Sequence, residues 1–344
     1  MIPALRAGGA AAGALRAAAL CVLALLAPAV SWADYPDKAI KILVPYGPGG
    51  ATDVAARILA DAMGRLLKQP VVVENKGGGS GVIALREVAA AKPDGYTLLV
   101  GNVTTNTINP ILQIAGTPGS LKNDLTVVTK LVEVPGMLIA TKKNFPPNTL
   151  PEMVDYAKAN PGKVFYNSAG ILAYSHLDML ELQRRAGIGL TIVPYAQGGG
   201  AGQTDIVSGE IQLALRNVAS ALPFVRSGQI KALAVTTEER LPTFPDVPTF
   251  KEQGYAGVGT NAWQAIFVPR GTPDAVMERI NTAALQVLED PAVRQRLTDL
   301  QFVIAPTRTP AEARAWLDQE YAKWQVVAVQ GKKTYDAQQA QPQK

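Results

Sequence analysis

Short apolar runs alternate with amphipathic helical patterns from residue 35 onward, and this alternation limits the fold more than any single motif. Each run is bounded by Gly, Pro or Asn, and the runs fall at 40–44, 71–73, 97–100, 164–166, 190–193, 213–215, 232–235 and 265–268. Residues 53–67 show the helical pattern, because their apolar side chains recur on one face. The alternation predicts an α/β protein with mainly parallel sheets covered by helices.

The first 33 residues have the pattern of a secretory signal peptide. Arg6 and Arg16 supply positive charge, residues 17–26 form an apolar segment, and Ser31-Trp32-Ala33 is a small-x-small cleavage motif. The apolar segment is short for a bilayer span. We therefore expect export, cleavage after Ala33 and a periplasmic mature protein.

Cysteine content and charge exclude several classes of function. Cys21 is the one cysteine of the chain and lies within the signal segment, so a mature chain without it has no disulfide and no cysteine-based site. Loss of Arg6 and Arg16 leaves 31 basic and 28 acidic side chains. No run of Lys or Arg marks a nucleic-acid surface, so no nucleic-acid partner is expected.

Two places have the features of crossings between domains. The first is 134–136 followed by a strand at 137–140, and the second is a strand at 263–268 closed by 269–273. A chain that leaves one lobe, builds a second and returns forms two lobes with a ligand cleft between them. We predict a domain 1 and a domain 2, which comprise residues 34–136 plus 266–344 and residues 137–265. Helices expected near 273–288, 291–300 and 310–328 would pack on domain 1.

Three glycine-rich loops each follow a predicted strand and precede a predicted helix. They span 45–53, 167–170 with its helix opening near Ser175, and 195–200. Such loops gather at the carboxyl ends of the strands and offer free N–H groups and the positive end of a helix dipole, so together they predict an anion site. Tyr46 and Tyr195 flank two of the loops as candidate cleft walls. The alternative is that these glycines only permit tight turns.

A fourth loop raises the possibility of a nucleotide site. Gly79-Ser80-Gly81-Val82-Ile83-Ala84 matches G-x-G-x-x-A, but no acidic residue follows at the distance that holds a ribose. The chain contains no G-K-[ST], which excludes a P-loop. No cofactor is expected.

Catalytic and metal-binding constellations are also missing from the sequence. His176 is the one histidine, and the chain has no G-x-S-x-G elbow. His176 stands near a predicted helix start, where it would cap or pack, or else contact the ligand. We expect no metal and no catalytic residue, and therefore a binding protein rather than an enzyme.

The sequence resembles the periplasmic substrate-binding proteins of tripartite tricarboxylate transporters, the Bug or TctC-like family. The resemblance covers nearly the whole chain after the signal segment, in the expected order. The matching stretches are YPDKAIKILVPYGPGGATDVAARILA, VVVENKGGGSGVIALREVAAAKPDGYTLLVGN, YAKANPGKVFYNSAG, GQIKALAVTTEERLPTFPDVPTFKEQGY and VPRGTPDAVMERINTAALQVLEDPAVRQRL.

The resemblance implies a two-lobed type II periplasmic binding fold, which closes over a small carboxylate and delivers it to an integral-membrane permease. It also implies that backbone groups and ordered water hold the carboxylate. The matching positions are Gly47, Gly49, Gly50, Thr52, Asp53, Thr105, Asn106, Ser168, Ala169, Gly170, Tyr195 and Gly198. Asp53 repels an anion, so we expect it to cap the helix or to order a water.

Departures from the family pattern point to Arg216. Relatives usually carry an acidic or neutral residue there, and Asn106 replaces a common histidine. An arginine at a strand end should face the cleft and could grip a carboxylate through two hydrogen bonds. We hypothesise that Arg216 binds a second carboxylate, of a dicarboxylate or of an aromatic acid with two anionic ends. The alternative is a surface ion pair with a neighbouring acid.

The predicted function is therefore that of a monomeric periplasmic solute-binding protein that captures a small organic carboxylate by lobe closure. Two alternatives remain open at this point. One is a secreted α/β enzyme that acts on a carboxylated substrate. The other is a sensing component that presents the closed lobes to a membrane receptor.

Overall fold

The computed structural model describes residues 35–114, 121–195 and 202–340. By the density of its internal contacts, the segment Pro36–Lys344 forms a compact unit separate from Met1–Tyr35, and the architecture below concerns this unit alone. None of the helices in the described residues combines the length and apolar character that crossing a membrane requires.

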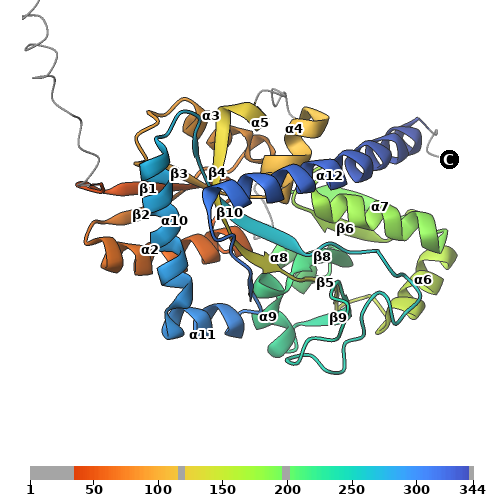
Figure 1. Ribbon diagram of the computed structural model, residues 1–344. Helices are drawn as coiled ribbons and strands as arrows, with labels where there is room; N and C mark the ends of the chain where they lie inside the picture. The colour runs from red at the N-terminus through yellow and green to blue at the C-terminus, as the bar shows by residue number, and fades with distance from the viewer. Residues whose placement is uncertain (1–34, 115–120, 196–201, 341–344) are drawn as a thin grey trace, which may run out of the picture. The chain divides into compact units, whose positions relative to one another are not determined.

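A six-stranded sheet holds the strand order β11-β4-β10-β3-β1-β2. Strand β1 lies between β2 and β3 and pairs with both in parallel, whereas β10 runs antiparallel between β3 and β4 (Figure 1). The strands are β1 (Ile40–Val44), β2 (Val71–Asn75), β3 (Thr97–Asn102), β4 (Leu125–Val134), β10 (Ala262–Pro269) and β11 (Val303–Ile304).

A second sheet of five strands has the order β7-β6-β8-β5-β9. Strand β6 pairs in parallel with β7 and β8, and β5 runs antiparallel between β8 and β9. The strands are β5 (Gly136–Thr141), β6 (Phe165–Ser168), β7 (Thr191–Pro194), β8 (Leu213–Asn217) and β9 (Ile230–Val235). The α/β prediction is confirmed. The prediction of mainly parallel sheets is wrong, because β10 pairs antiparallel with both of its neighbours in the first sheet and β5 does so in the second.

Strand β4 is the longest strand described, and the search for apolar runs missed it. Its sequence LTVVTKLVEV interrupts the apolar residues with Thr126, Lys130 and Glu133, all of them only partly buried. The strand still buries seven of its ten residues, since β10 and β11 pair along its edges. Tertiary packing therefore determines the strand structure of this segment, which the local apolar pattern leaves ambiguous.

Helices connect the strands, and α2, α7 and α9 follow the carboxyl ends of β1, β6 and β8. The principal helices are α2 (Ala51–Leu67), α3 (Val82–Ala89), α6 (Leu150–Ala159), α7 (Tyr174–Ala186), α9 (Val218–Arg226), α10 (Asp274–Glu289), α11 (Pro291–Asp299) and α12 (Pro310–Gln339). The short helical segments are η2 (Gly79–Gly81), the π-helical turn η3 (Thr104–Ile108), α4 (Asn109–Leu112), α5 (Leu121–Asp124) and α8 (Gln203–Ser208).

Helix α12 differs from its prediction, which ended near residue 328. It begins at the N-cap Thr309, whose hydroxyl accepts a hydrogen bond from the Glu312 N–H (3.1 Å), and it continues to Gln339. Figure 1 shows α12 reaching α7, and it contacts both β4 of the first sheet and α7, which packs on the second. The helix therefore spans elements of both sheets rather than packing on the predicted domain 1 alone.

The chain passes twice between the sheets, and Thr236 connects the two crossings. One crossing is Pro135 between β4 and β5, and the other is the segment that enters β10. The Thr236 hydroxyl accepts a hydrogen bond from the Gly136 N–H (2.7 Å) and donates one to Asn261 Oδ1 (2.9 Å). A Cβ on Gly259 would lie 2.5 Å from Thr236 Cγ2, so this close approach requires glycine. The predicted domain boundaries at 136 and 266 stay predictions.

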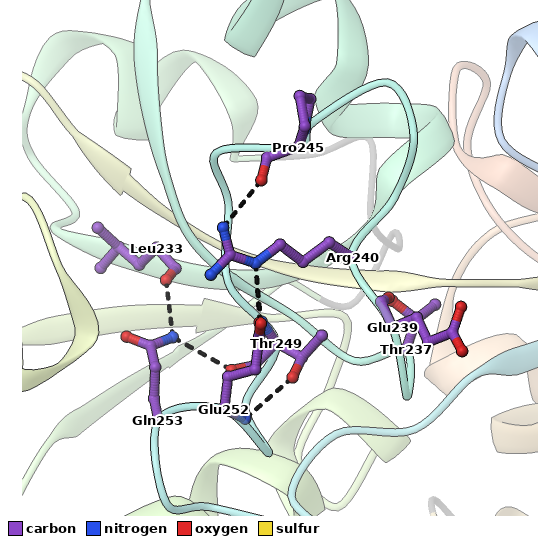
Figure 2. A network of polar contacts seen from close by, with 8 residues as sticks. All are labelled: Leu233, Thr237, Glu239, Arg240, Pro245, Thr249, Glu252 and Gln253. Carbon is purple, nitrogen blue, oxygen red and sulfur yellow. Dashed lines mark hydrogen bonds and ion pairs between the residues drawn. The ribbon is translucent and has the colours of Figure 1, made fainter.

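A polar network stabilises the long connection between β9 and β10 (Figure 2). Arg240 Nε donates to both carboxylate oxygens of Glu252 at 3.0 Å, and its Nη1 donates to the Pro245 carbonyl at 2.9 Å. Glu252 also accepts from the Thr249 N–H (2.7 Å) while its own N–H donates to the Thr249 hydroxyl (3.0 Å). These reciprocal bonds, a capping box in form, explain how a stretch with few apolar residues is ordered.

Candidate ligand-binding site

A cavity of about 60 Å³ lies at the carboxyl ends of strands from both sheets. The first sheet contributes the loops after β1 and β3, and the second contributes the ends of β6 and β8 with the helices that follow them. The lining residues are Tyr46, Gly50, Ala51, Thr52, Asn102, Thr104, Asn167, Ser168, Ala169, Tyr174, Ser175, Leu215, Arg216, Asn217 and Ser220. Neither aspartate nor glutamate is among these lining residues.

Three helices of eight or more residues begin at this cavity. The first turns of α2, α7 and α9 contribute Thr52, Ser175 and Ser220 to its wall. The first turn of a helix carries N–H groups without an intrahelical partner, and the helix dipole places partial positive charge there. Three such ends around one small space make it favourable for an anion.

Arg216, the fourth residue of β8, adds a full positive charge to the cavity wall. Its side chain is buried, with 5% of the residue exposed. Burial lowers the pKa of Arg216 to about 10, against the opposing effect of Tyr174 and Tyr195, so the guanidinium stays protonated at neutral pH. The alternative expected for this arginine, an ion pair on the surface, does not fit a buried side chain.

Asp53 shapes the first glycine loop and does not line the cavity. Its carboxylate accepts hydrogen bonds from the Gly49 N–H (3.0 Å), from Asn75 Nδ2 (2.8 Å) and from Arg57 Nε (3.0 Å). Burial alone would raise the pKa of Asp53, but these three donors outweigh burial and hold it below its ordinary value. The ionised carboxylate therefore fixes the loop at Gly49, whose φ of +84° favours glycine.

The turn after β3 is closed by a reciprocal pair of hydrogen bonds. The Asn102 N–H donates to the Thr105 hydroxyl (3.1 Å), and the Thr105 N–H donates to Asn102 Oδ1 (3.2 Å). The Thr105 hydroxyl also donates to Asn106 Oδ1 (2.7 Å), and the Asn106 carbonyl accepts from the Tyr321 hydroxyl. Thr105 and Asn106 thus hold the turn, whereas Asn102 reaches the cavity.

The loop after β6 brings Ser168 and Ala169 to the cavity wall. The Ser168 hydroxyl donates to the Gly170 carbonyl (3.0 Å) and lies 3.0 Å from the Ser175 hydroxyl, so it accepts from Ser175. Tyr195 stands outside the wall, where its hydroxyl donates to the Asp205 carboxylate and its N–H donates to the Ser168 carbonyl (2.9 Å).

The structure brings six of the residues named from the sequence to the cavity, and these are Tyr46, Gly50, Thr52, Ser168, Ala169 and Arg216. Seven others lie outside its wall, namely Gly47, Gly49, Asp53, Thr105, Asn106, Gly170 and Tyr195. Gly198 lies outside the described residues. The lining residues that the sequence did not single out as site residues are Ala51, Asn102, Thr104, Asn167, Tyr174, Ser175, Leu215, Asn217 and Ser220, although Ala51 and Asn167 lie within two of the predicted loops.

A recognisable signal accompanies three of the missed residues. Asn102 and Asn217 are the last residues of β3 and β8, and Asn167 is next to last in β6. The rule that ligands bind at the carboxyl ends of strands would have selected all three.

His176 packs and caps away from the cavity. Its Nδ1 accepts a hydrogen bond from the Leu172 N–H (2.8 Å), and its ring meets that of Tyr335 edge-on at 5.3 Å. Burial lowers the pKa of His176 to about 4. Across the ranges 35–114, 121–195 and 202–340, no group of three or more acidic, histidine or cysteine side chains could hold a metal ion.

The fold and this site define a two-lobed periplasmic-type solute-binding protein. A family model described as "Tripartite tricarboxylate transporter family receptor" matches residues 55–328. The chain belongs to this TctC family, so the resemblance carried by the sequence is confirmed. The family and its structural relatives are binding proteins, and the chain is accordingly a solute-binding protein and not an enzyme.

Three solved structures show the same fold. The periplasmic binding protein BugD is 32% identical, with a TM-score of 0.80 over 86% of this chain and 98% of its own. MatC from Rhodopseudomonas palustris with bound malate is 33% identical, with a TM-score of 0.78 over 86% and 100%. The R. palustris protein Rpa4515 with adipate is 28% identical, with a TM-score of 0.80 over 86% and 98%. The predicted two-lobed type II fold is confirmed by these matches.

Replacement of His176 by asparagine should flatten the acid side of the stability profile. A folded pKa of about 4 against 6.5 in the unfolded chain favours neutral imidazole in the fold, so this contribution is complete above pH 6.5 and is lost as the pH falls toward 4. The loss amounts to roughly 3 kcal/mol. Asparagine does not titrate and keeps an oxygen acceptor for the Leu172 N–H.

The measurement is urea unfolding of wild type and His176→Asn at pH 7 and pH 4. The stability difference between the two proteins should shrink by roughly 3 kcal/mol at the lower pH. Asp178, on the same helix, has a pKa raised to about 7 by burial and titrates in the opposite sense, but it is present in both proteins and cancels. Parallel pH profiles would contradict the assignment.

Proposed function

We propose that this protein is a periplasmic solute-binding protein that captures a small organic carboxylate in the cavity between its two sheets. The observation that carries the proposal is the convergence of three helix N-termini and the buried Arg216 on a cavity whose described lining contains no acidic side chain. MatC and Rpa4515, which share the fold at 33% and 28% identity, have malate and adipate bound.

Two separate positive centres favour a ligand with two anionic ends. One is the start of α2, where the Thr52 hydroxyl and the first-turn N–H groups lie. The other is the guanidinium of Arg216 at the end of β8, on the second sheet. A carboxylate at each centre would join loops from both sheets, so the two centres favour a dicarboxylate over a monocarboxylate. An aromatic acid with two anionic ends would likewise place one anionic group at each positive centre.

Ligand that bridges the two sheets would shift the population toward a closed form. The family description supports delivery of the carboxylate to the integral-membrane permease of a tripartite transporter. The pattern of residues 1–33 supports export with cleavage after Ala33, and we propose that the mature protein acts as a monomer. The alternative is a sensing function, in which the closed form binds a membrane receptor. Uptake assays with the permease genes deleted distinguish transport from sensing.

A thermal-shift screen of the mature protein tests the ligand class. The panel contains acetate and benzoate, the dicarboxylates succinate, malate, adipate and phthalate, and the tricarboxylate citrate. A ligand that binds only the folded state raises the melting temperature with concentration, by an amount that corresponds to about 2.7 kcal/mol at 100 times Kd. Dicarboxylates should give the largest shifts. A panel without any shift would contradict carboxylate binding altogether.

Removal of the Arg216 guanidinium should weaken dicarboxylates selectively. Arg216→Ala deletes a charge-assisted contact in a buried site, which is worth about 1.5–3 kcal/mol, so the dicarboxylate Kd should rise roughly 10- to 100-fold by calorimetry. Arg226→Ala is the matched control, because Arg226 is the exposed last residue of α9. Wild-type affinity in Arg216→Ala, or equal losses in both variants, would eliminate the second carboxylate contact.

A further inference from the structure

Asn102 lies in the cavity wall, where its side chain forms hydrogen bonds that its place at a strand end does not predict. It is the last residue of β3, it is 6% exposed, and its side chain lies among three partners from separate segments. Oδ1 accepts from the Tyr46 hydroxyl (3.2 Å) and from the Thr105 N–H (3.2 Å), and Nδ2 donates to the Thr52 hydroxyl oxygen (3.3 Å). The amide therefore connects the β1 loop, the β3 turn and the start of α2.

The direction of this amide is determined by its surroundings. A backbone N–H can only donate, so the Thr105 N–H requires the oxygen of Asn102, and not its nitrogen, on that side. The nitrogen must then face Thr52. The Tyr46 hydroxyl supports the same orientation, because burial raises its pKa to about 12 and the phenol stays a protonated donor at neutral pH.

Thr104 is held from the second sheet's side, because the Tyr174 N–H, in the first turn of α7, donates to the Thr104 hydroxyl (3.2 Å). The Tyr46 hydroxyl has one proton and donates it to Asn102 Oδ1, which can only accept. Thr104, Tyr46 and Asn102 all line the cavity.

We infer that Asn102 is a specificity-determining residue that acts through Thr52, so that the α2 end of the cavity selects an ionised carboxylate over its neutral carboxamide. The Asn102 Nδ2–H occupies one of the two lone pairs of the Thr52 oxygen, so the Thr52 proton is directed away from Asn102. Together with the first-turn N–H groups of α2, this end presents more donors than acceptors. A carboxylate accepts at both oxygens, whereas a carboxamide has N–H donors that meet other donors.

The inference rests on the proposed carboxylate function. It adds that Asn102 orients the Thr52 hydroxyl, which the helix ends alone do not do. Without Asn102, the Thr52 hydroxyl could accept as readily as it donates. The first turn of α2 would still attract negative charge, but it would discriminate less sharply between a carboxylate and an amide of the same shape. Discrimination, rather than affinity, is therefore the property that Asn102 controls.

The test uses two probe pairs, adipate with its diamide adipamide and malate with its diamide malamide. For each protein the ratio of diamide Kd to dicarboxylate Kd is obtained by calorimetry, with the diamide measured by displacement. Asn102→Ala should lower this ratio about tenfold, because Thr52 regains an acceptor for the amide N–H. In a Thr52→Val background the same substitution should leave the ratio unchanged within twofold, since the hydroxyl that it acts through is absent.

Asn281→Ala is the matched control, because Asn281 is also a buried asparagine, but its amide donates to the Arg308 carbonyl (2.8 Å) and it lies outside the cavity wall. It should leave the ratio unchanged. An equal rise of both Kd values in Asn102→Ala would show a merely structural role and overturn the inference. Wild-type protein that binds neither dicarboxylate would overturn it too, whereas only failure of the whole carboxylate panel overturns the proposed function.

Thermal unfolding shows whether Asn102→Ala folds. If it does not, Thr52→Val alone decides the matter. It should raise the Kd of the dicarboxylate about tenfold and that of the diamide less than threefold, because only the charged oxygen loses a strong donor. Equal increases for the two probes would contradict the inference.

Discussion

The cost of burying the Arg216 guanidinium is the constraint on which the binding site depends. A buried charge is unfavourable unless its surroundings compensate for it, and here burial lowers the arginine's pKa to about 10 without removing the charge. Three helix N-termini add partial positive charge to the same small space. We propose that an anion bound in this cavity offsets the positive charge that Arg216 and the helix ends place there.

Hydrogen bonds join the two crossings between the sheets to each other and to α7. Thr236 joins the crossings through Gly136 and Asn261. On the α7 side, the Asp178 carboxylate accepts from both the N–H and the hydroxyl of Thr260, each at 2.9 Å. The segment that enters β10 is thus tied to α7, the helix whose first turn lines the cavity. Helix α7 therefore contacts both the cavity and one of the crossings.

Much of the fold followed from the sequence, because apolar periodicity is a local signal. Periodicity predicted β1, α2 and the strands of the second sheet, and the two predicted crossings indicated two lobes, as the family resemblance also did. It missed β4, whose polar interruptions at Thr126, Lys130 and Glu133 hide a strand that packing buries. The sequence pattern also predicted mainly parallel sheets. That prediction failed because tertiary pairing sets the direction of β5 and β10, and the local sequence does not show it.

Site residues were predictable where their position along a strand places them at the cavity. They were less predictable where hydrogen bonding decides whether a side chain faces the cavity. Arg216 and Ser168 stand at strand ends and reach the cavity. Thr105 and Asn106 are close in sequence to the site, but their side chains are used within the β3 turn. Asn102, the last residue of β3 and three residues before Thr105, takes the position in the wall. Spacing identifies a loop, whereas only the network of donors and acceptors shows which of its residues faces a ligand.

A crystal structure of the mature protein with its tightest-binding dicarboxylate tests the central claim most directly. The account predicts one carboxylate within hydrogen-bonding distance of the Thr52 hydroxyl and the first-turn N–H groups of α2, and the other carboxylate on the Arg216 guanidinium. Ligand density in the cavity with both carboxylates remote from Arg216, or ligand bound elsewhere in the molecule, would contradict it.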